Sequence, residues 1–200
     1  MSKTLPSIRD AEINTGDVVF VRIDCNVPLT DDGFIADAFR LEAVTPTLSF
    51  LKEKGARIII AGAIGRPKGK RDESLTTKCI AQYFEGRVLD RCHYVDEAIG
   101  PVVQDAIAAC LPGDGIVLEN LRFWTQEETN DEEFAKDLSK FAKIYVNDAF
   151  GQSHRNQSSI VAITKFLPSY SGLCLEKEVQ ALQSVLSDGK SPVVGIIGGA

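Results

Sequence analysis

Long apolar runs and metal-binding patterns are both missing from this sequence. No apolar run approaches the roughly 20 residues that a membrane-spanning helix needs, and residues 1–6 lack the apolar core of a secretory signal peptide. The five cysteines form no Cys-x-x-Cys pair, and no His and Cys residues have the spacing of a zinc site. We therefore expect a cytoplasmic protein with reduced thiols, without a membrane segment or a bound metal ion.

The glycine-rich signatures of several enzyme classes are missing as well. Residues 65–70 (GRPKGK) lack the glycine spacing of a P-loop, and Arg71 stands where its Ser or Thr would follow the lysine. No Gly-x-Gly-x-x-Gly follows the first expected strand, and no Gly-x-Ser-x-Gly nucleophile elbow occurs. A generic dinucleotide-binding domain is therefore a poor interpretation of the sequence.

Positive charge is also in short supply. The 22 Lys and Arg residues are outnumbered by 28 Asp and Glu residues, and the net charge is −6. An acidic chain is a poor candidate for binding nucleic acid or an anionic membrane. The basic residues that are present are unevenly spread, however, and several stand directly after apolar runs.

What the sequence does contain is a repeated alternation of strand-like and helix-like patterns. Short apolar runs predict strands at 18–23, 57–61, 116–118 and 143–146, with a weaker strand within 87–94. Helical spacing of apolar residues predicts helices at 40–54, 74–84, 96–111 and 130–140. Strands that are apolar without alternation are typical of burial on both faces. We predict an α/β fold, a three-layer α/β/α Rossmann-like domain with a mostly parallel sheet.

The pattern changes after residue 158, which indicates where this domain ends. We assign residues 1–172 to the domain and residues 173–190, with a helical pattern at 176–186, to a helix that bridges toward a second domain. The apolar run 192–197 would be the first strand of that domain. We therefore expect residues 191–200 to be its truncated start.

Polar side chains stand at the ends of four expected strands. Because parallel strands end at one edge of a sheet, side chains far apart in the sequence meet there. Several arginines at such an edge suit a small, doubly anionic ligand, since the guanidinium fork binds carboxylate and phosphate oxygens in pairs. The candidates are Asp24, Asn26, Arg40, Arg66, Lys68, Asn120, Arg122, Asp148, His154 and Arg155.

Most of these side chains also have a purely structural explanation. A polar residue near a strand end often serves only to pair a charge or to cap a loop. The alternatives are an ion pair of Asp24 with an arginine, solvated surface for Arg66, an ion pair of Arg122 with Glu119, a loop cap or a tie to Arg155 for Asp148, and a structural histidine at His154.

Five segments, in order and in spacing, resemble the phosphoglycerate kinase family. The resemblance covers the whole chain but only the N-terminal half of the family's length. The segments are VRIDCNVP at 21–28, GRPKG at 65–69, ENLRF at 119–123, NDAFG at 147–151 with His154 and Arg155, and the late segment 173–178.

This resemblance implies a two-domain kinase of glycolysis, monomeric and cytoplasmic, that transfers a phosphoryl group reversibly between 1,3-bisphosphoglycerate and ADP. It implies that this chain supplies the half that binds 3-phosphoglycerate or 1,3-bisphosphoglycerate. The C-terminal nucleotide-binding domain would hold Mg²⁺ with ADP or ATP, and hinge closure would bring the two together. By itself this chain would bind no cofactor and would be inactive.

The resemblance also implies roles for residues that match the family's motifs. Asp24 and Asn26 would hold the carboxylate and hydroxyl region of the glycerate, and Gly65 would contribute to substrate binding. Arg40 would be the catalytic residue, because it would also stabilise charge on the phosphoryl group in transfer.

Three arginines would clamp the phosphate that does not transfer, namely Arg66, Arg122 and Arg155. The segment that the family usually reads as Ser-His-Leu-Gly-Arg-Pro is Gly-Ala-Ile-Gly-Arg-Pro here, so Ala63 replaces a histidine. Gln157 likewise replaces a histidine. Cys25 replaces an aromatic residue. These departures leave a second interpretation open, a non-catalytic phosphoglycerate kinase-like domain that binds an anion or a partner.

Overall fold

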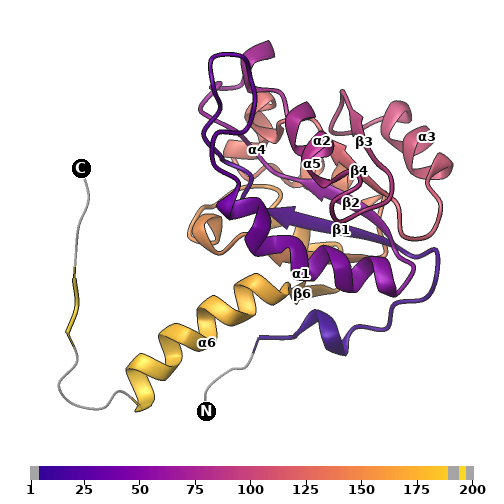
Figure 1. Ribbon diagram of the computed structural model, residues 1–200. Coiled ribbons are helices and arrows are strands. Elements are labelled where there is room, and N and C mark those ends of the chain that lie inside the picture. Colours follow the sequence, from indigo (N-terminus) through magenta and orange to yellow (C-terminus); the bar gives the residue numbers. More distant parts are fainter. Residues whose placement is uncertain (1–4, 189–193, 197–200) are drawn as a thin grey trace.

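A computed structural model describes residues 5–188 and 194–196. Its centre is a six-stranded sheet with the order β3-β4-β2-β1-β5-β6, and every neighbouring pair in it is parallel (Figure 1). The strands are β1 (Val18–Ile23), β2 (Arg57–Ala61), β3 (Cys92–Val95), β4 (Gly115–Leu118), β5 (Ile144–Asp148) and β6 (Ser169–Ser171). The predicted parallel sheet is confirmed.

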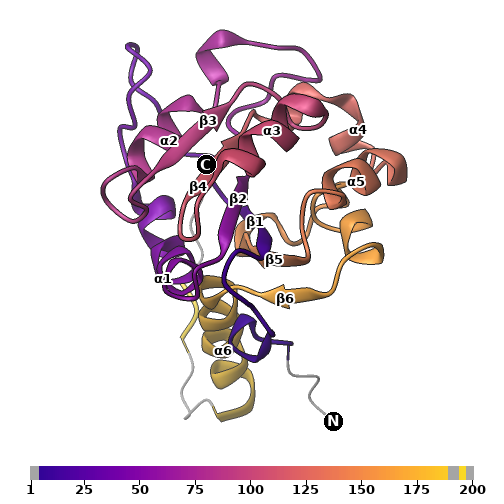
Figure 2. The ribbon, with the colours of Figure 1, turned by 90° about the vertical axis from the view of Figure 1, so that its right-hand side faces the viewer.

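Helices cover both faces of the sheet, which confirms the three-layer arrangement (Figure 2). One face packs on α1 (Phe39–Glu53) and α2 (Lys78–Phe84), and the other on α3 (Pro101–Ala109) and α5 (Glu132–Ser139). Successive residues of β1 show the alternation, because Val19 and Val21 lie in the first core while Phe20 lies in the second. The strands are apolar on both sides because both sides are covered.

The structure changes some predicted boundaries and adds two elements. α3 begins at Pro101 and not at residue 96, with the proline in the first helical turn where its missing N–H costs nothing. The weak strand predicted within 87–94 is β3 at Cys92–Val95. The sequence patterns did not predict β6 or the short helix α4 (Thr125–Glu128).

The helix predicted at 176–186 is α6 (Leu173–Asp188), which extends away from the sheet (Figure 1). Its first turn is rooted in the domain through Thr47 and the buried Asp148. The Thr47 hydroxyl donates to Asp148 Oδ2 at 2.6 Å and accepts from the Leu173 N–H, while Asp148 Oδ1 accepts from the Leu175 N–H. The alternatives for Asp148 were a loop cap and a tie to Arg155. Its carboxylate instead fixes the first turn of α6.

The last predicted strand falls largely outside the described residues. Of residues 192–197 the structure describes only 194–196, which have no regular secondary structure. In the part of the chain that is described, no helix is both long and apolar enough to cross a membrane.

Candidate functional site

The candidate site lies at the carboxyl edge of the sheet, above its central strands. In the register of the sheet, Ile23 of β1 pairs with Asp148 of β5, and Arg22 pairs with Ala61 at the end of β2. These three strands therefore end level with one another. The segments that follow them carry most of the predicted site residues, so the topology brings these residues together as expected.

Asp24, directly after β1, is the hub of one group of contacts. Its Oδ2 accepts from Arg40 Nη1 at 2.8 Å, and its Oδ1 faces Gln152 Nε2 at 3.4 Å. The Asn26 N–H also donates to Oδ1, at 3.2 Å. The ion pair considered for Asp24 is thus present, and its partner is Arg40, which stands in the first turn of α1.

A second group of contacts joins Asn26 to Gly65 and Arg122. The Gly65 N–H donates to Asn26 Oδ1 and the Gly65 carbonyl accepts from Arg122 Nη1, both at 2.8 Å. Arg122 Nη2 donates to Gln152 Oε1 at 3.3 Å, which links this group to Asp24. The sequence had not singled out Gln152, a buried amide inside the polar stretch 147–155.

Arg122 is nearly buried, and its charge is only weakly compensated. Its Nε lies 3.9 Å from Glu128 Oε1 and has no hydrogen-bond partner among the described residues. Burial lowers the pKa of Arg122, and the positive charges of Arg155 and Arg22 lower it further. Three guanidinium groups therefore act on one another at this edge, an arrangement that an anion would stabilise.

Arg155 and Arg66, two of the three arginines expected around the phosphate, are exposed. Arg155 lines a pocket of about 240 Å³ with Glu128, Asn156 and the buried Gln157. Arg66 lies on the loop after β2, and its side chain makes no hydrogen bond or ion pair within the described part of the chain, which fits the solvated alternative. Arg66 therefore shares the loop of Gly65 but is not drawn into the contacts around Asp24.

The side chains of Asn120 and Glu119 bond to the segments around the site and hold these segments together. The buried Asn120 amide donates from Nδ2 to the carbonyls of Ile64 and Leu75, at 2.8 and 2.9 Å, and its Oδ1 accepts from the Arg122 N–H. The alternative of an ion pair between Glu119 and Arg122 is wrong. Its side chain faces Thr77 and Tyr94 instead.

Two departures from the family pattern are packed against each other. A Cβ built on Gly62 would lie 2.3 Å from Cys25 Sγ, so the small residue at 62 makes room for the thiol beside β1. Burial raises the pKa of the Cys25 thiol to about 12, which keeps it protonated. Ala63 is buried next to them. His154 is exposed, so it is not a buried structural histidine.

Within residues 5–188 and 194–196, no three His, Cys, Asp or Glu side chains are grouped so that they could hold a metal ion. The described edge gathers guanidinium and amide donors beside the Asp24 carboxylate, a combination of groups that suits an anionic ligand.

Comparison with known proteins gives one consistent result. The family model for phosphoglycerate kinase matches residues 8–200. The chain is 43% identical over 194 residues to the phosphoglycerate kinase of Desulforudis audaxviator and 42% identical to that of Moorella thermoacetica, covering 97% of this chain and 49% of each relative. The chain thus spans about half the length of the curated relatives it matches.

Solved structures agree with the sequence comparison. The crystal structure of phosphoglycerate kinase from Pyrococcus horikoshii OT3 superposes with a TM-score of 0.84 at 31% identity, over 94% of this chain and 47% of that one. The enzyme from Coxiella burnetii gives a TM-score of 0.82 at 28% identity, over 94% and 46%.

Proposed function

The chain belongs to the phosphoglycerate kinase family, and we propose that it forms the substrate-binding half of such an enzyme. The reaction is the reversible transfer of a phosphoryl group between 1,3-bisphosphoglycerate and ADP, a step of glycolysis in the cytoplasm. This half binds 3-phosphoglycerate or 1,3-bisphosphoglycerate at the carboxyl edge of the sheet. By itself it does not turn over.

One observation carries the proposal more than any other. Arg122 is buried, its Nε lacks a hydrogen-bond partner among the described residues, and the charges of Arg22 and Arg155 act on it. A buried cation that is left short of partners is costly unless an anion completes its surroundings. A phosphate group brought to this edge supplies those acceptors.

The remaining roles follow the family resemblance. Asp24 and Asn26 bind the carboxylate and hydroxyl region of the glycerate, whereas Arg66 and Arg155 join Arg122 around the phosphate that stays. Arg40 stabilises the charge on the phosphoryl group in transfer. Its present partner, Asp24 Oδ2, lies only 2.8 Å away, so Arg40 exchanges one anion for another when the substrate enters.

Nucleotide binding belongs to the half of the family's length that this chain does not span. There Mg²⁺ with ADP or ATP is held, and closure about a hinge brings the two halves together as a monomeric enzyme. The residues described here contribute anion binding and charge stabilisation, and they hold no nucleotide.

Isothermal titration of the chain with 3-phosphoglycerate tests the proposal. We expect saturable binding, which Arg122→Met abolishes. Arg91→Met is a matched control, because Arg91 pairs with Asp114 at the opposite edge of the sheet, directly before β3 and β4, and it should leave the affinity unchanged. Absence of heat and of amide chemical-shift changes at millimolar ligand would contradict the proposal.

A second function is favoured by Ala63 and Gln157, which replace two histidines of the family pattern. It is that of a phosphoglycerate kinase-like domain that binds an anion or a partner without catalysis. Mixing the chain with the C-terminal half of the Moorella thermoacetica enzyme separates the two functions. ATP formation from 1,3-bisphosphoglycerate and Mg-ADP in the mixture would exclude the non-catalytic alternative.

A further inference from the structure

The loop after β2, residues 65–71, carries four basic side chains, those of Arg66, Lys68, Lys70 and Arg71. We call it the basic loop. Lys68 adopts a φ of +55°, a left-handed conformation that a non-glycine residue keeps only where its surroundings enforce it. Gly69, at φ +73°, passes so close to α4 that an added Cβ would lie 2.2 Å from Thr125 Cγ2.

The near end of this loop is fixed by contacts with the site itself. Asn26 and Arg122 hold the peptide groups of Gly65, and the Gly69 N–H donates to the Arg122 carbonyl at 3.1 Å. Beyond Gly69 these contacts stop. The far end of the loop is held by a different residue, Arg71.

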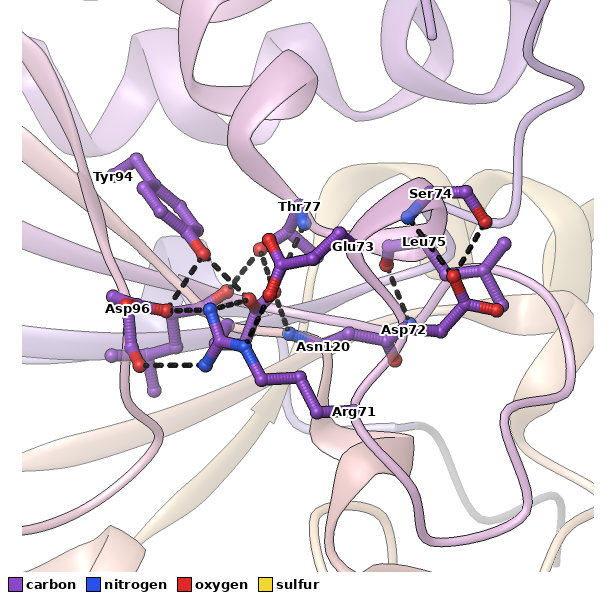
Figure 3. Close-up of polar contacts among 11 residues, drawn as sticks. Arg71, Asp72, Glu73, Ser74, Leu75, Thr77, Tyr94, Asp96 and Asn120 are labelled. Atoms are coloured by element: carbon purple, nitrogen blue, oxygen red, sulfur yellow. Dashed lines mark hydrogen bonds and ion pairs between the residues drawn. The ribbon is translucent and has the colours of Figure 1, made fainter. Parts of the chain in front are cut away.

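Arg71 lies among three carboxylates that come from three segments of the chain (Figure 3). Its Nε donates to Glu73 Oε1 at 2.8 Å, and its Nη2 bonds to Asp96, just beyond the end of β3, and lies 3.4 Å from Glu119 Oε2, just beyond β4. The hydrogen bonds to Glu73 and Asp96 raise the pKa of Arg71. The guanidinium thus spans from its own loop to the ends of two strands.

Glu119 makes this more than a surface ion pair. Its side chain is fully buried, and it accepts hydrogen bonds from Tyr94, from the Thr77 N–H and hydroxyl, and from the Asn120 N–H. Isolated exposed ion pairs are flexible and add little to stability. In this pair, however, Glu119 is buried and fixed by its own hydrogen bonds. The side chain of the next residue, Asn120, fixes the Ile64 and Leu75 carbonyls on either side of the loop.

The basic side chains of the loop differ in whether they pair with an acidic side chain. The side chains of Arg66, Lys68 and Lys70 form no ion pair within the described residues, whereas Arg71 is shared among three acids. Arg71 therefore neutralises carboxylates that would otherwise repel an anion, and it leaves the other three cations of the loop available.

We propose that Arg71 is a positioning residue for substrate binding: bound to Glu73, Asp96 and Glu119, it fixes the far end of the basic loop so that Arg66 faces the anion site. The inference rests on the proposed function, since it assigns a role in binding the same phosphate. Arg71 does not touch the substrate. It acts by removing freedom from the loop before the substrate arrives.

Variants of the full chain distinguish the effect of loop position on substrate binding from the effect of the Arg71 charge. Arg71→Met removes one positive charge together with the contacts of Arg71 to the three carboxylates, which we call the clamp. Arg71→Met combined with Asp96→Asn restores the charge balance but not the clamp. Arg71→Lys keeps the charge and replaces the fork by a single ammonium group. Arg91→Met is the matched control at the opposite edge. The measurements are the dissociation constant of 3-phosphoglycerate and amide hydrogen exchange.

We expect Arg71→Met and the charge-balanced double variant each to weaken binding by about tenfold, and Arg71→Lys to recover part of it. Hydrogen exchange at Lys70, beyond Gly69, whose N–H donates to the Pro67 carbonyl, should quicken in both Met variants and stay unchanged in β1. Parental affinity in the double variant would overturn the proposal in favour of a purely electrostatic effect, and parental affinity in all variants would overturn it outright.

The two proposals fail in different ways. If the parent chain does not bind 3-phosphoglycerate, the proposed function is wrong, and exchange in the ligand-free chain still decides on the clamp. A parental exchange rate at Lys70 in Arg71→Met would then show that Arg71 does not hold the far end of the loop. Should that variant unfold, Arg71→Lys provides the same comparison in a milder form.

Discussion

The guanidinium of Arg40 and the carboxylate of Asp24 form an ion pair across the mouth of the site, with 2.8 Å between Nη1 and Oδ2. Arg40 stands in the first turn of α1, where the helix dipole disfavours a positive charge. Asp24 compensates for this position. The Arg40 side chain is 46% exposed but the Asp24 side chain only 16%, so Arg40 is the member of the pair that can turn toward solvent.

Arg40→Ala should therefore affect chemistry much more than stability. We expect the free energy of unfolding to change by about 1 kcal/mol, because Arg40 is half-exposed and Asp24 keeps the Asn26 N–H and Gln152 Nε2 as donors. In a fusion with a family nucleotide-binding half, kcat should fall by about 100-fold or more with a small change in KM, because the charge acts on the transition state. Equal losses in kcat/KM and in substrate affinity would indicate ground-state binding instead. Arg87→Ala, in the turn after α2, is the control.

Asp148 predicts a specific dependence of stability on pH. Burial raises its pKa to about 6 in the folded protein, against 3.8 for an ordinary aspartate. Between these values the folded protein keeps a proton that the unfolded chain has lost. The contribution of this group to stability is therefore full below about pH 4 and is lost as the pH rises through about 6, a change of roughly 2–3 kcal/mol.

Asp148→Asn should remove this dependence. Unfolding by urea at a series of pH values from 4.5 to 7 gives the two stability curves, and their difference should change up to about pH 6 and level off above it. Parallel curves would show that Asp148 titrates in the folded protein as it does in the unfolded chain.

Asn120→Ala should destabilise the protein strongly although it removes a small side chain. The substitution leaves two carbonyls, those of Ile64 and Leu75, and the Arg122 N–H without their partner. We expect a loss of roughly 2–4 kcal/mol in the free energy of unfolding, measured with denaturant. Asn156→Ala, at an exposed position, should cost less than about 0.5 kcal/mol. Similar losses of unfolding free energy in the two variants would show that the hydrogen bonds of Asn120 do not hold these segments together.

Gly62 and Cys25 should be energetically coupled. Gly62→Ala places a methyl group 2.3 Å from Cys25 Sγ, an overlap that we expect to cost about 1–3 kcal/mol. In a Cys25→Ala background the same change should cost at least about 1 kcal/mol less, because the sulfur has gone. Denaturant unfolding of the four proteins closes the cycle, and strict additivity would mean that the two positions do not interact.

Periodicity was sufficient to predict the layers of this fold but not all of its elements. The strands 18–23 and 57–61 are apolar because both sheet faces are covered, so they leave a clear signal. β6 has three residues, directly follows Pro168 and takes its place by pairing with β5, which no local pattern records. α4 is four residues long and likewise too short for a period.

The candidate site shows the same division. Strand ends are visible in the sequence, so Asp24, Asn26 and Arg122 could be brought to one edge by topology alone. Which charges pair could not be predicted, because that depends on distances between segments. Glu119 faces Arg71, while the ion-pair partner of Arg122 among the described residues is Glu128, at 3.9 Å. Gln152 had no signal beyond its place in a polar stretch, and its role depends on reaching Arg122 and Asp24 together.

The edge strand β6 also receives the start of the chain. Ser7 forms a parallel bridge with Ser171, and the Ser171 N–H and hydroxyl both donate to the Pro6 carbonyl, across 165 positions of sequence. Contacts of such long separation are formed late, because closing the intervening chain is costly. During synthesis on the ribosome this seam cannot close until residue 171 has emerged, so the nascent domain spends most of its translation with that edge unsealed.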